Sequence, residues 1–212
     1  MKTKEARVTI YLDIETIPGE EPRLDSFTAK ANLVDPVKIE ADLKAKKEKG
    51  WADQSFDPFK GEIFCIGMAV NNGSPFCIVG ANEKEMMEQL EVEIEKYPFA
   101  IIVGHNLLEF DAFWLFIKGL KYRLPAVVMA MTNKNNLHDT MKMMDGPGWK
   151  KMTSLDKMAK NFGLDGKGEI DGSMVWGLVK EGQGDKVCKY CESDVGILRM
   201  CYLVLDDLGL SR

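Results

Sequence analysis

Two carboxylates, Asp13 and Glu15, lie at the end of a short apolar segment, Val8 to Ile14, that is rich in β-branched residues. This segment predicts a buried strand, which Pro18 and the following glycine would stop. A strand directs residues i and i+2 to one face, so Asp13 and Glu15 project together if Ile14 points into the core. For this pair alone, an acidic pair at a fraying strand end is an equally good interpretation. A buried strand nevertheless has no structural use for two carboxylates.

A second acidic motif follows another apolar segment, Phe99 to Val103, which predicts a further strand. Asn106 comes directly after it, and Asp111 falls in the first turn of a helix expected over Glu109 to Leu120. Taken alone, Asp111 is best explained as an acid that the helix macrodipole favours, and Asn106 as a turn or cap residue. The motif becomes a candidate for a shared site only jointly with the first motif, because both follow apolar segments.

The third motif lies in a long helix expected from Lys186 to Leu208. Tyr190 and Asp194 are spaced i and i+4, which places a phenol and a carboxylate on one helix face. Tyr202 and Asp206 repeat the spacing, but twelve residues later they are turned by roughly 120° and displaced by roughly 18 Å. Only one of the two pairs can therefore face the site, and we assign Tyr190 and Asp194 to it on resemblance to a known motif as well as on geometry. Three segments then deliver four carboxylates to one place, and such a cluster requires cations.

The remaining segments indicate an α/β order. The stretch from Glu20 to Gly61 is polar and reads as an excursion with one helix from about Asp35 to Lys49. Ile63 to Val70 and Pro75 to Val79 flank a turn of Asn, Gly and Ser and predict an antiparallel hairpin beside the first strand. Further elements are expected at Asn136 to Thr140, from Thr153 or Ser154 through Asn161, and at Gly172 to Lys180.

Length and composition predict one large globular domain, residues 1–212, with its excursion at about 20–61. Hydrophobic residues make up 45% and charged residues 29%, which are ordinary values. No apolar run approaches the roughly 20 residues that a membrane-spanning helix needs, and the first residues lack the apolar stretch of a signal peptide. These features predict a soluble, cytoplasmic protein without a membrane partner.

The net charge of -5 argues mildly against a protein that coats nucleic acid. The argument is weak, because cations bound at an acidic site would invert the local field. Basic clusters remain that could meet phosphates, although solvated surface is the better interpretation of each alone; they are Lys44 to Lys49, Lys118 to Arg123 and Lys150 to Lys160.

Cysteine and histidine offer weaker candidates. Five cysteines, an odd number lying mostly in apolar runs, predict reduced core residues and no disulfide framework. Cys188 and Cys191 have the spacing of half a zinc site, but no second pair follows at ligand spacing, which favours core packing. His105 could act as a general base, and His138 is better explained as structural.

The order of the three motifs resembles the DEDD 3′-5′ exonuclease superfamily. The matching residues are Asp13-Ile14-Glu15-Thr16, then Gly104-His105-Asn106-Leu107-Leu108-Glu109-Phe110-Asp111, and then Tyr190 with Asp194. The tyrosine is similar to that of the DEDDy branch, where the other branch has a histidine. The gap between Asn106 and Phe110 resembles the proofreading domain of family B DNA polymerases, especially its stand-alone predicted relatives. The resemblance spans roughly Val8 to Leu205, and its motifs are specific jointly although each is common.

The resemblance implies an α/β, RNase H-like fold with a mixed central sheet flanked by helices, and hydrolysis with two divalent cations, Mg²⁺ or Mn²⁺. By carry-over, Asp13 would bridge both metals, Glu15 and Asp194 would hold the metal that activates water, and Asp111 the other. Tyr190 would orient the water. Thr16, Asn106 and Phe110 would contact the terminal nucleotide, with a plain core role the favoured alternative for Phe110.

These motifs predict an enzyme that degrades single-stranded DNA from its 3′ end to nucleoside 5′-monophosphates. An RNase or oligonucleotide phosphodiesterase of the same fold stays open, since the contact at the 2′ position cannot be located from spacing. A catalytically silent nucleic-acid-binding module is the other alternative. Four uncompensated carboxylates near phosphates would oppose binding, which disfavours it. A polymerase or another replication or repair partner is compatible with the sequence.

Overall fold

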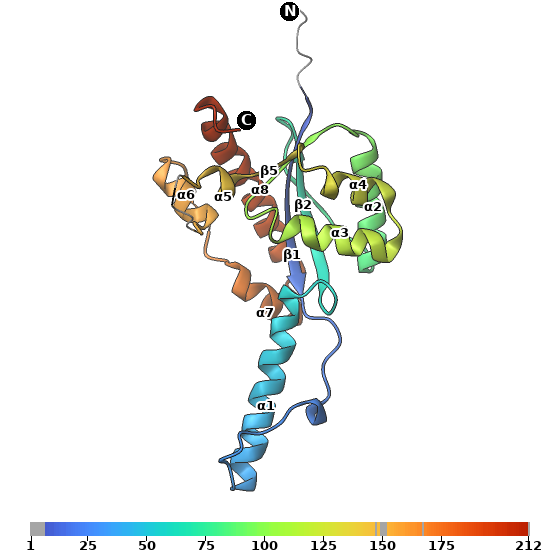
Figure 1. Ribbon diagram of the computed structural model, residues 1–212, viewed down its shortest axis with the longest axis vertical. Coiled ribbons are helices and arrows are strands. Elements are labelled where there is room, and N and C mark those ends of the chain that lie inside the picture. Colours follow the sequence, from blue (N-terminus) through green and yellow to red (C-terminus); the bar gives the residue numbers. More distant parts are fainter. Residues whose placement is uncertain (1–6, 147, 149–151, 167, 212) are drawn as a thin grey trace, which may run out of the picture.

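The computed structural model describes residues 7–146, 148, 152–166 and 168–211. The first residues of the chain, and with them the segment inspected for a signal peptide, lie outside this set, as does part of the basic cluster Lys150 to Lys160. A central sheet stands between two layers of helices, and one long helix projects from this body (Figure 1).

The sheet has five strands in the order β3-β2-β1-β4-β5. β1 (Thr9–Ile17) pairs antiparallel with β2 (Glu62–Val70), which in turn pairs antiparallel with β3 (Phe76–Ile78). On its other side β1 pairs parallel with β4 (Ile101–Gly104), and β4 with β5 (Leu137–Asp139). The mixed sheet and the hairpin agree with the prediction from the sequence.

One face of the sheet packs against α2 (Glu83–Glu95), α3 (Asp111–Tyr122) and α4 (Pro125–Thr132). β1 presents Ile10, Leu12 and Ile14 to this layer, and all three are buried. Alternation along the strand then turns Tyr11, Asp13 and Glu15 to the opposite face. The apolar residues of the first layer therefore determine which face receives the acids.

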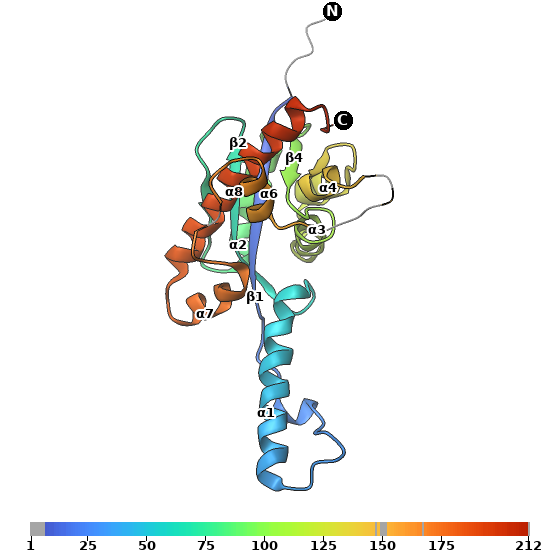
Figure 2. The ribbon, with the colours of Figure 1, turned by 90° about the vertical axis from the view of Figure 1, so that its left-hand side faces the viewer.

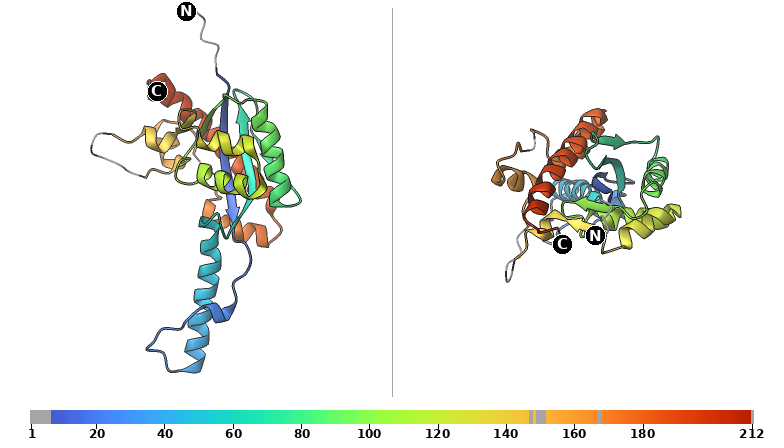
Figure 3. Two further views of the ribbon diagram at one scale, coloured as in Figure 1. Left: turned by 45° about the vertical axis from the view of Figure 1, so that its right-hand side comes forward. Right: turned by 90° about the horizontal axis from the view of Figure 1, so that it is seen from above.

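The opposite face is covered by α8 (Gly184–Asp207), with α5 (Thr140–Met143), α6 (Leu155–Asn161) and α7 (Val175–Lys180) packed beside it. Figure 3, seen from above, shows the sheet between the two helical layers. Tyr11 and Val103 join the buried residues Val195 and Leu198 of α8 in one core cluster. α8 thus lies directly over the face that carries Asp13 and Glu15.

Residues 18–61 form the projecting part of the molecule (Figures 1 and 2). They contain α1 (Pro36–Ala52), in which no residue is buried, between two short 3-10 helices, Leu24–Ser26 and Asp53–Phe56. Asp35 caps α1 through a hydrogen bond from the Val37 N–H. Near the body, Trp51 packs edge-to-face on Trp176 of α7, with ring centroids 5.3 Å apart. The expected excursion is therefore a helical arm joined to the body at its base.

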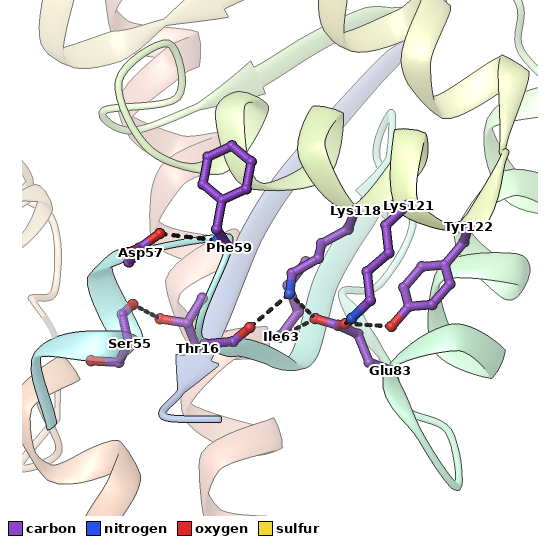
Figure 4. Close-up of polar contacts among 10 residues, drawn as sticks. Thr16, Ser55, Asp57, Phe59, Ile63, Glu83, Lys118, Lys121 and Tyr122 are labelled. Carbon is purple, nitrogen blue, oxygen red and sulfur yellow. Dashed lines mark hydrogen bonds and ion pairs between the residues drawn. The ribbon is translucent and has the colours of Figure 1, made fainter. Parts of the chain in front are cut away.

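A buried ion-pair network fixes the end of this arm to the helices (Figure 4). Lys118 of α3 is 2% exposed, and its Nζ lies 2.9 Å from Oε1 of Glu83 while donating to the Gly61 carbonyl at 2.7 Å. Glu83 also accepts hydrogen bonds from Lys121 Nζ and the Tyr122 hydroxyl. The basic cluster Lys118 to Arg123 is therefore partly committed to a structural carboxylate and is not simply a solvated surface.

Several boundaries differ from those expected. β1 continues to Ile17, because Glu15 and the residues after it keep pairing with β2 past a register shift at Glu15/Thr16. α4 was not predicted at all. The helix expected over Gly172 to Lys180 is a 3-10 turn, Gly172–Met174, followed by α7. Within the part of the chain that the structure describes, every helix is too short or too polar to cross a membrane.

Candidate active site

Asp13 and Glu15 lie side by side on the face of the sheet that α8 covers. Glu15 is buried and Asp13 half-buried. One carboxylate oxygen of each lies within 4.8 Å of the other and of Cys191 Sγ. Cys191 comes from α8 and donates to Oδ2 of Asp13 at 3.6 Å. The predicted projection of the two acids to one face is thus the arrangement found.

Asp111 reaches the same place from the other side of β1. β1 pairs with β4 at Thr9 to Tyr11, so Ile14 lies beyond this paired segment. The Ile14 N–H donates instead to Oδ1 of Asp111, at 3.1 Å. Burial raises the pKa of the Asp111 carboxyl well above its usual value, and the charge of Asp13 raises it further. The charge of Asp13 acts on this carboxyl, and Asp111 also contacts the backbone between the first two acids.

Tyr190 and Asp194 approach from α8, and both are buried. Burial raises the pKa of the Tyr190 hydroxyl, and the charges of Asp194, Glu15 and Asp13 raise it in turn. All of these groups therefore act on one another electrostatically. Asp194 completes the set of four carboxylates that three separate segments were predicted to deliver.

A glycine allows α8 to come this close. Gly67 is the residue of β2 opposite Asp13. A Cβ atom there would lie 2.7 Å from Cys191 Sγ and 2.9 Å from Val195 Cγ2, well inside van der Waals contact. The absence of a side chain at Gly67 thus sets the distance between the tyrosine-bearing helix and the strand with the two acids. This role of Gly67 could not be predicted from the sequence.

The loop after β4 is held by a residue that the sequence analysis did not single out. Asn106 adopts a left-handed backbone, with φ of 61°. Asp139 at the end of β5 is buried, and its two carboxylate oxygens accept from the N–H groups of Asn106 and Leu108, each at 3.0 Å. It also caps α5 by accepting from the Met141 N–H. An acid between a short strand and a helix is a capping pattern, which could have identified it.

The other candidates occupy supporting positions. His105 contacts Thr140 Oγ1 through Nδ1 at 2.9 Å and the Thr153 carbonyl through Nε2 at 2.6 Å, so both ring nitrogens have structural partners. Phe110 is partly buried against the core, and its ring centroid lies 6.0 Å from that of Trp114, which suits a core aromatic residue. The Thr16 hydroxyl donates to the Ser55 carbonyl at 2.7 Å, which ties the base of the arm to β1 (Figure 4).

The second tyrosine and aspartate of α8 belong to another environment. The Tyr202 hydroxyl is 2.9 Å from His138 Nδ1, and its ring packs edge-to-face on Tyr11 at 5.8 Å. Asp206 accepts a hydrogen bond from Ser211 near the end of the chain. The repeat of the spacing therefore serves packing at this end of the helix, while Tyr190 and Asp194 face the acids.

The donor set suits a hard divalent cation. Carboxylate oxygens are the ligands that Mg²⁺ and Mn²⁺ prefer, and like charges held this close need such a counterion. Asp13, Glu15, Asp111 and Asp194 supply these oxygens around the carboxyl-terminal half of β1, beside the ends of β4 and β5. Ligand sites of open α/β sheets lie at such strand ends.

A mixed five-stranded sheet with helices on both faces is the RNase H-like fold of the 3′-5′ exonucleases. The chain belongs to the family of predicted 3′-5′ exonucleases related to the exonuclease domain of PolB, whose model matches residues 76–207. The match contains Asp111, Tyr190 and Asp194, while β1 with its two acids lies before it. No curated protein sequence matches the chain.

One solved structure shows the similarity of fold, and a second one matches more weakly. The family B DNA polymerase from the hyperthermophilic archaeon Pyrobaculum calidifontis superimposes with a TM-score of 0.60 at 13% identity, over 91% of this chain and 24% of the polymerase. E. coli exonuclease I in complex with a 5cy-dT13 oligonucleotide gives a TM-score of 0.44 at 10% identity, over 86% of this chain and 43% of the other. This chain therefore spans about a quarter of the polymerase.

Proposed function

We propose that the protein is a metal-dependent 3′-5′ exonuclease that hydrolyses single-stranded DNA ends to nucleoside 5′-monophosphates. The observation that carries the proposal is the meeting of Asp13 and Glu15 from β1, Asp111 from α3, and Tyr190 and Asp194 from α8. Family membership supports the polarity of the reaction. For Asp13 and Glu15, which precede the matched residues, the support is this geometry.

The four carboxylates would hold two divalent cations, Mg²⁺ or Mn²⁺. Glu15 and Asp194 would hold one ion and Asp111 the other, and Asp13 would contribute to both. When bound, such ions supply the charge that activates water and stabilises the leaving oxygen. The role of the chain is to fix the oxygens, through the strand geometry of Asp13 and Glu15 and the hydrogen bond from Ile14 to Asp111.

Tyr190 acts as a hydrogen-bonding group and not as a covalent nucleophile. The raised pKa of its hydroxyl keeps it protonated at neutral pH. A protonated phenol beside Asp194 and Glu15 can orient the attacking water by donating or accepting a hydrogen bond. Its buried ring limits its movement, which suits a positioning role.

The terminal nucleotide meets residues of the loop after β4 and of β1. Asn106 is half-buried, and its left-handed backbone is held by the hydrogen bond from its N–H to Asp139. Thr16 lies at the register shift of β1 and contributes to nucleotide binding through this position. Its hydroxyl already donates a hydrogen bond to the Ser55 carbonyl. Phe110 supports the loop from the core side.

DNA is the proposed substrate for two reasons. The Pyrobaculum calidifontis protein of similar fold is a DNA polymerase, and the family is related to the exonuclease domain of PolB. An RNase or oligonucleotide phosphodiesterase is the second candidate, favoured only by the shared fold. A silent binding module is disfavoured by the complete set of carboxylates, which opposes phosphate binding without cations.

The arm of residues 18–61 shapes substrate entry. It begins directly after the strand that carries Asp13 and Glu15, and Ser55 at its base is bonded to Thr16. α1 has no buried residue and carries exposed lysines that can meet phosphates. A deletion of the arm that leaves the preferred substrate length unchanged would count against this assignment.

The test uses matched 5′-labelled single-stranded DNA and RNA, with wild type and Asp13→Ala, in Mg²⁺, in Mn²⁺ and in EDTA. A DNA ladder that shortens from the 3′ end, requires metal and is absent in Asp13→Ala is the expected result. A ladder on RNA alone would replace the substrate by RNA. Retained DNA binding without a ladder in either metal would establish the silent module instead.

A further inference from the structure

Four of the five cysteines gather at one place beside the carboxylate site. The Sγ atoms of Cys65, Cys77 and Cys188 all lie within 4.8 Å of one another. Cys191 lies against Cys65 and Cys77, close enough for side-chain hydrogen bonding. The fifth, Cys201, is buried in a different cluster. The half-site spacing of Cys188 and Cys191 therefore does have a second pair, which comes from the β2–β3 hairpin and was invisible in the sequence.

The backbone explains why these thiols meet. Residue 67 of β2 pairs with Cys77 of β3, so Cys65, two residues earlier, projects to the same face as Cys77. Cys188 and Cys191 are i and i+3 on α8 and share one face of the helix. That face packs on the hairpin where Gly67 permits close approach. The hairpin thus offers two sulfur donors and α8 offers Cys188, with Cys191 one turn further along the same helix face.

We propose that this cluster is a thiolate site for a thiophilic metal ion, Zn²⁺ or another ion of similar softness, with Cys65, Cys77 and Cys188 as ligands and Cys191 placed to complete four. Sulfur donors in a closed set of this kind select such ions, whereas the neighbouring oxygen site selects hard ones. Cys77 and Cys188 are half-buried, which leaves an entry path, while Cys65 and Cys191 are buried.

The surroundings suit a structural ion. Apolar residues enclose the cluster, among them Val175, Val187 and the partly buried Phe64. Such a shell excludes water and strengthens the bond between a thiolate and a metal.

The ion would join the hairpin to the turn of α8 that carries the proposed tyrosine. Cys188 is two residues before Tyr190, and Cys65 is the residue of β2 opposite Glu15. An ion bound to both elements holds the two halves of the carboxylate site at a fixed separation. It is distinct from the catalytic cations, since its donors are sulfur and not oxygen.

The test measures metal binding directly, so its outcome does not depend on nuclease activity. Wild-type protein purified under reducing conditions is titrated with Co²⁺ as a spectroscopic probe and then with Zn²⁺ in competition. The expected result is an intense thiolate-to-cobalt charge-transfer absorption that saturates near one ion per chain and is displaced by Zn²⁺. Cys77→Ser and Cys188→Ser should each weaken binding by at least about 10- to 100-fold, the loss that removal of even a supporting group causes.

Two control variants separate this site from others. Asp111→Asn alters the oxygen site and should leave the absorption unchanged, and so should Cys201→Ser, whose thiol lies in the other cluster. The proposal is overturned if wild type shows no thiolate absorption, or if the absorption survives both cysteine substitutions. Peptide mapping of protein that has been reduced and purified again gives a further check. A disulfide between two of the clustered cysteines, in protein that binds no metal, would also overturn the proposal and assign the cluster to redox chemistry. Circular dichroism confirms that each variant is folded.

Discussion

The backbone N–H of Ile14 donates to the Asp111 carboxylate, although the two residues are 97 positions apart in the chain. Ile14 stands between Asp13 and Glu15, and its side chain is buried on the opposite face of the sheet. This hydrogen bond thus holds Asp111, the first residue of α3, against β1, which carries the other two acids. The site is assembled by backbone geometry, which makes it sensitive to small displacements of the surrounding elements.

Gly67→Ala should impair activity although it replaces none of the four carboxylates. The added Cβ would lie 2.7 Å from Cys191 Sγ, so α8 must shift away from β2. We expect about 10- to 100-fold lower kcat and about 1–3 kcal/mol lower stability. Steady-state kinetics and urea unfolding measure the two effects. Gly73→Ala, in the hairpin turn, is the control, and an active Gly67→Ala enzyme would show that the helix spacing is not critical.

Tyr190→Phe should lower kcat by about 100-fold and leave the substrate KM nearly unchanged, since the hydroxyl orients water and does not bind DNA. Tyr202→Phe is the matched change on the same helix. It removes the hydrogen bond to His138, which should cost about 1 kcal/mol of stability while kcat stays at the wild-type value. Equal loss of activity in both variants would mean that the phenol acts only through packing.

Asp139→Asn should loosen the loop that carries Asn106. The amide keeps one acceptor, so one of the N–H groups of Asn106 and Leu108 then faces an NH₂ group. We expect about 1–3 kcal/mol lower stability and a raised KM for short oligonucleotides. Asp145→Asn, in a neighbouring loop, serves as the control. Unchanged KM with lowered stability would limit Asp139 to a structural role.

The Glu83 network gives a pH dependence of stability. Burial alone would raise the pKa of Glu83, but hydrogen bonds from Tyr122, the Ile63 N–H and Lys118 outweigh it, and the folded pKa lies below 4.5. A lowered carboxyl pKa contributes stability above its unfolded value and loses it as the pH falls through the folded value. Wild type should therefore lose stability in urea as the pH falls below about 4.5.

Glu83→Gln should be about 3–5 kcal/mol less stable at pH 7, because it leaves the Lys118 charge buried and unpaired. Its unfolding free energy should also lose part of the acid dependence that wild type shows below about pH 4.5. Glu88→Gln on the exposed face of α2 removes only a surface ion pair with Lys84 and should change stability by less than about 1 kcal/mol. Similar behaviour of the two variants would contradict the role given to Glu83.

The sequence predicted the elements whose side chains alternate or repeat clearly. The hairpin, the first strand and α8 show the expected periodicities, and the three acidic motifs lie on them. α4 was missed because Pro125–Thr132 is apolar almost throughout and lacks the polar face that marks a surface helix. β1 was ended too early because acids are depleted in strands, whereas Glu15 pairs normally with Cys65.

Contacts between distant segments could not be predicted. In the sequence Gly67 is only a glycine that would weaken a strand. Its role in the close approach of α8 becomes clear only from its short distance to Cys191. The meeting of Cys65 and Cys77 with Cys188 depends on which face of the hairpin α8 covers. Asp139 carried a capping signal, but its hydrogen bonds to the loop after β4 depend on the parallel pairing of β4 and β5.

We expect the carboxylates of β1, α3 and α8 to work as one site. A double-mutant cycle tests this expectation. Single-turnover hydrolysis of 5′-labelled single-stranded DNA is measured for wild type, Asp13→Asn, Asp194→Asn and the double variant, with Asp206→Asn as control. Each single variant should lose about 10³-fold or more. The double variant should lose little more than the worse single one, because groups that act as a unit are not additive. Fully additive losses, or a single variant with wild-type rates, would contradict one shared site.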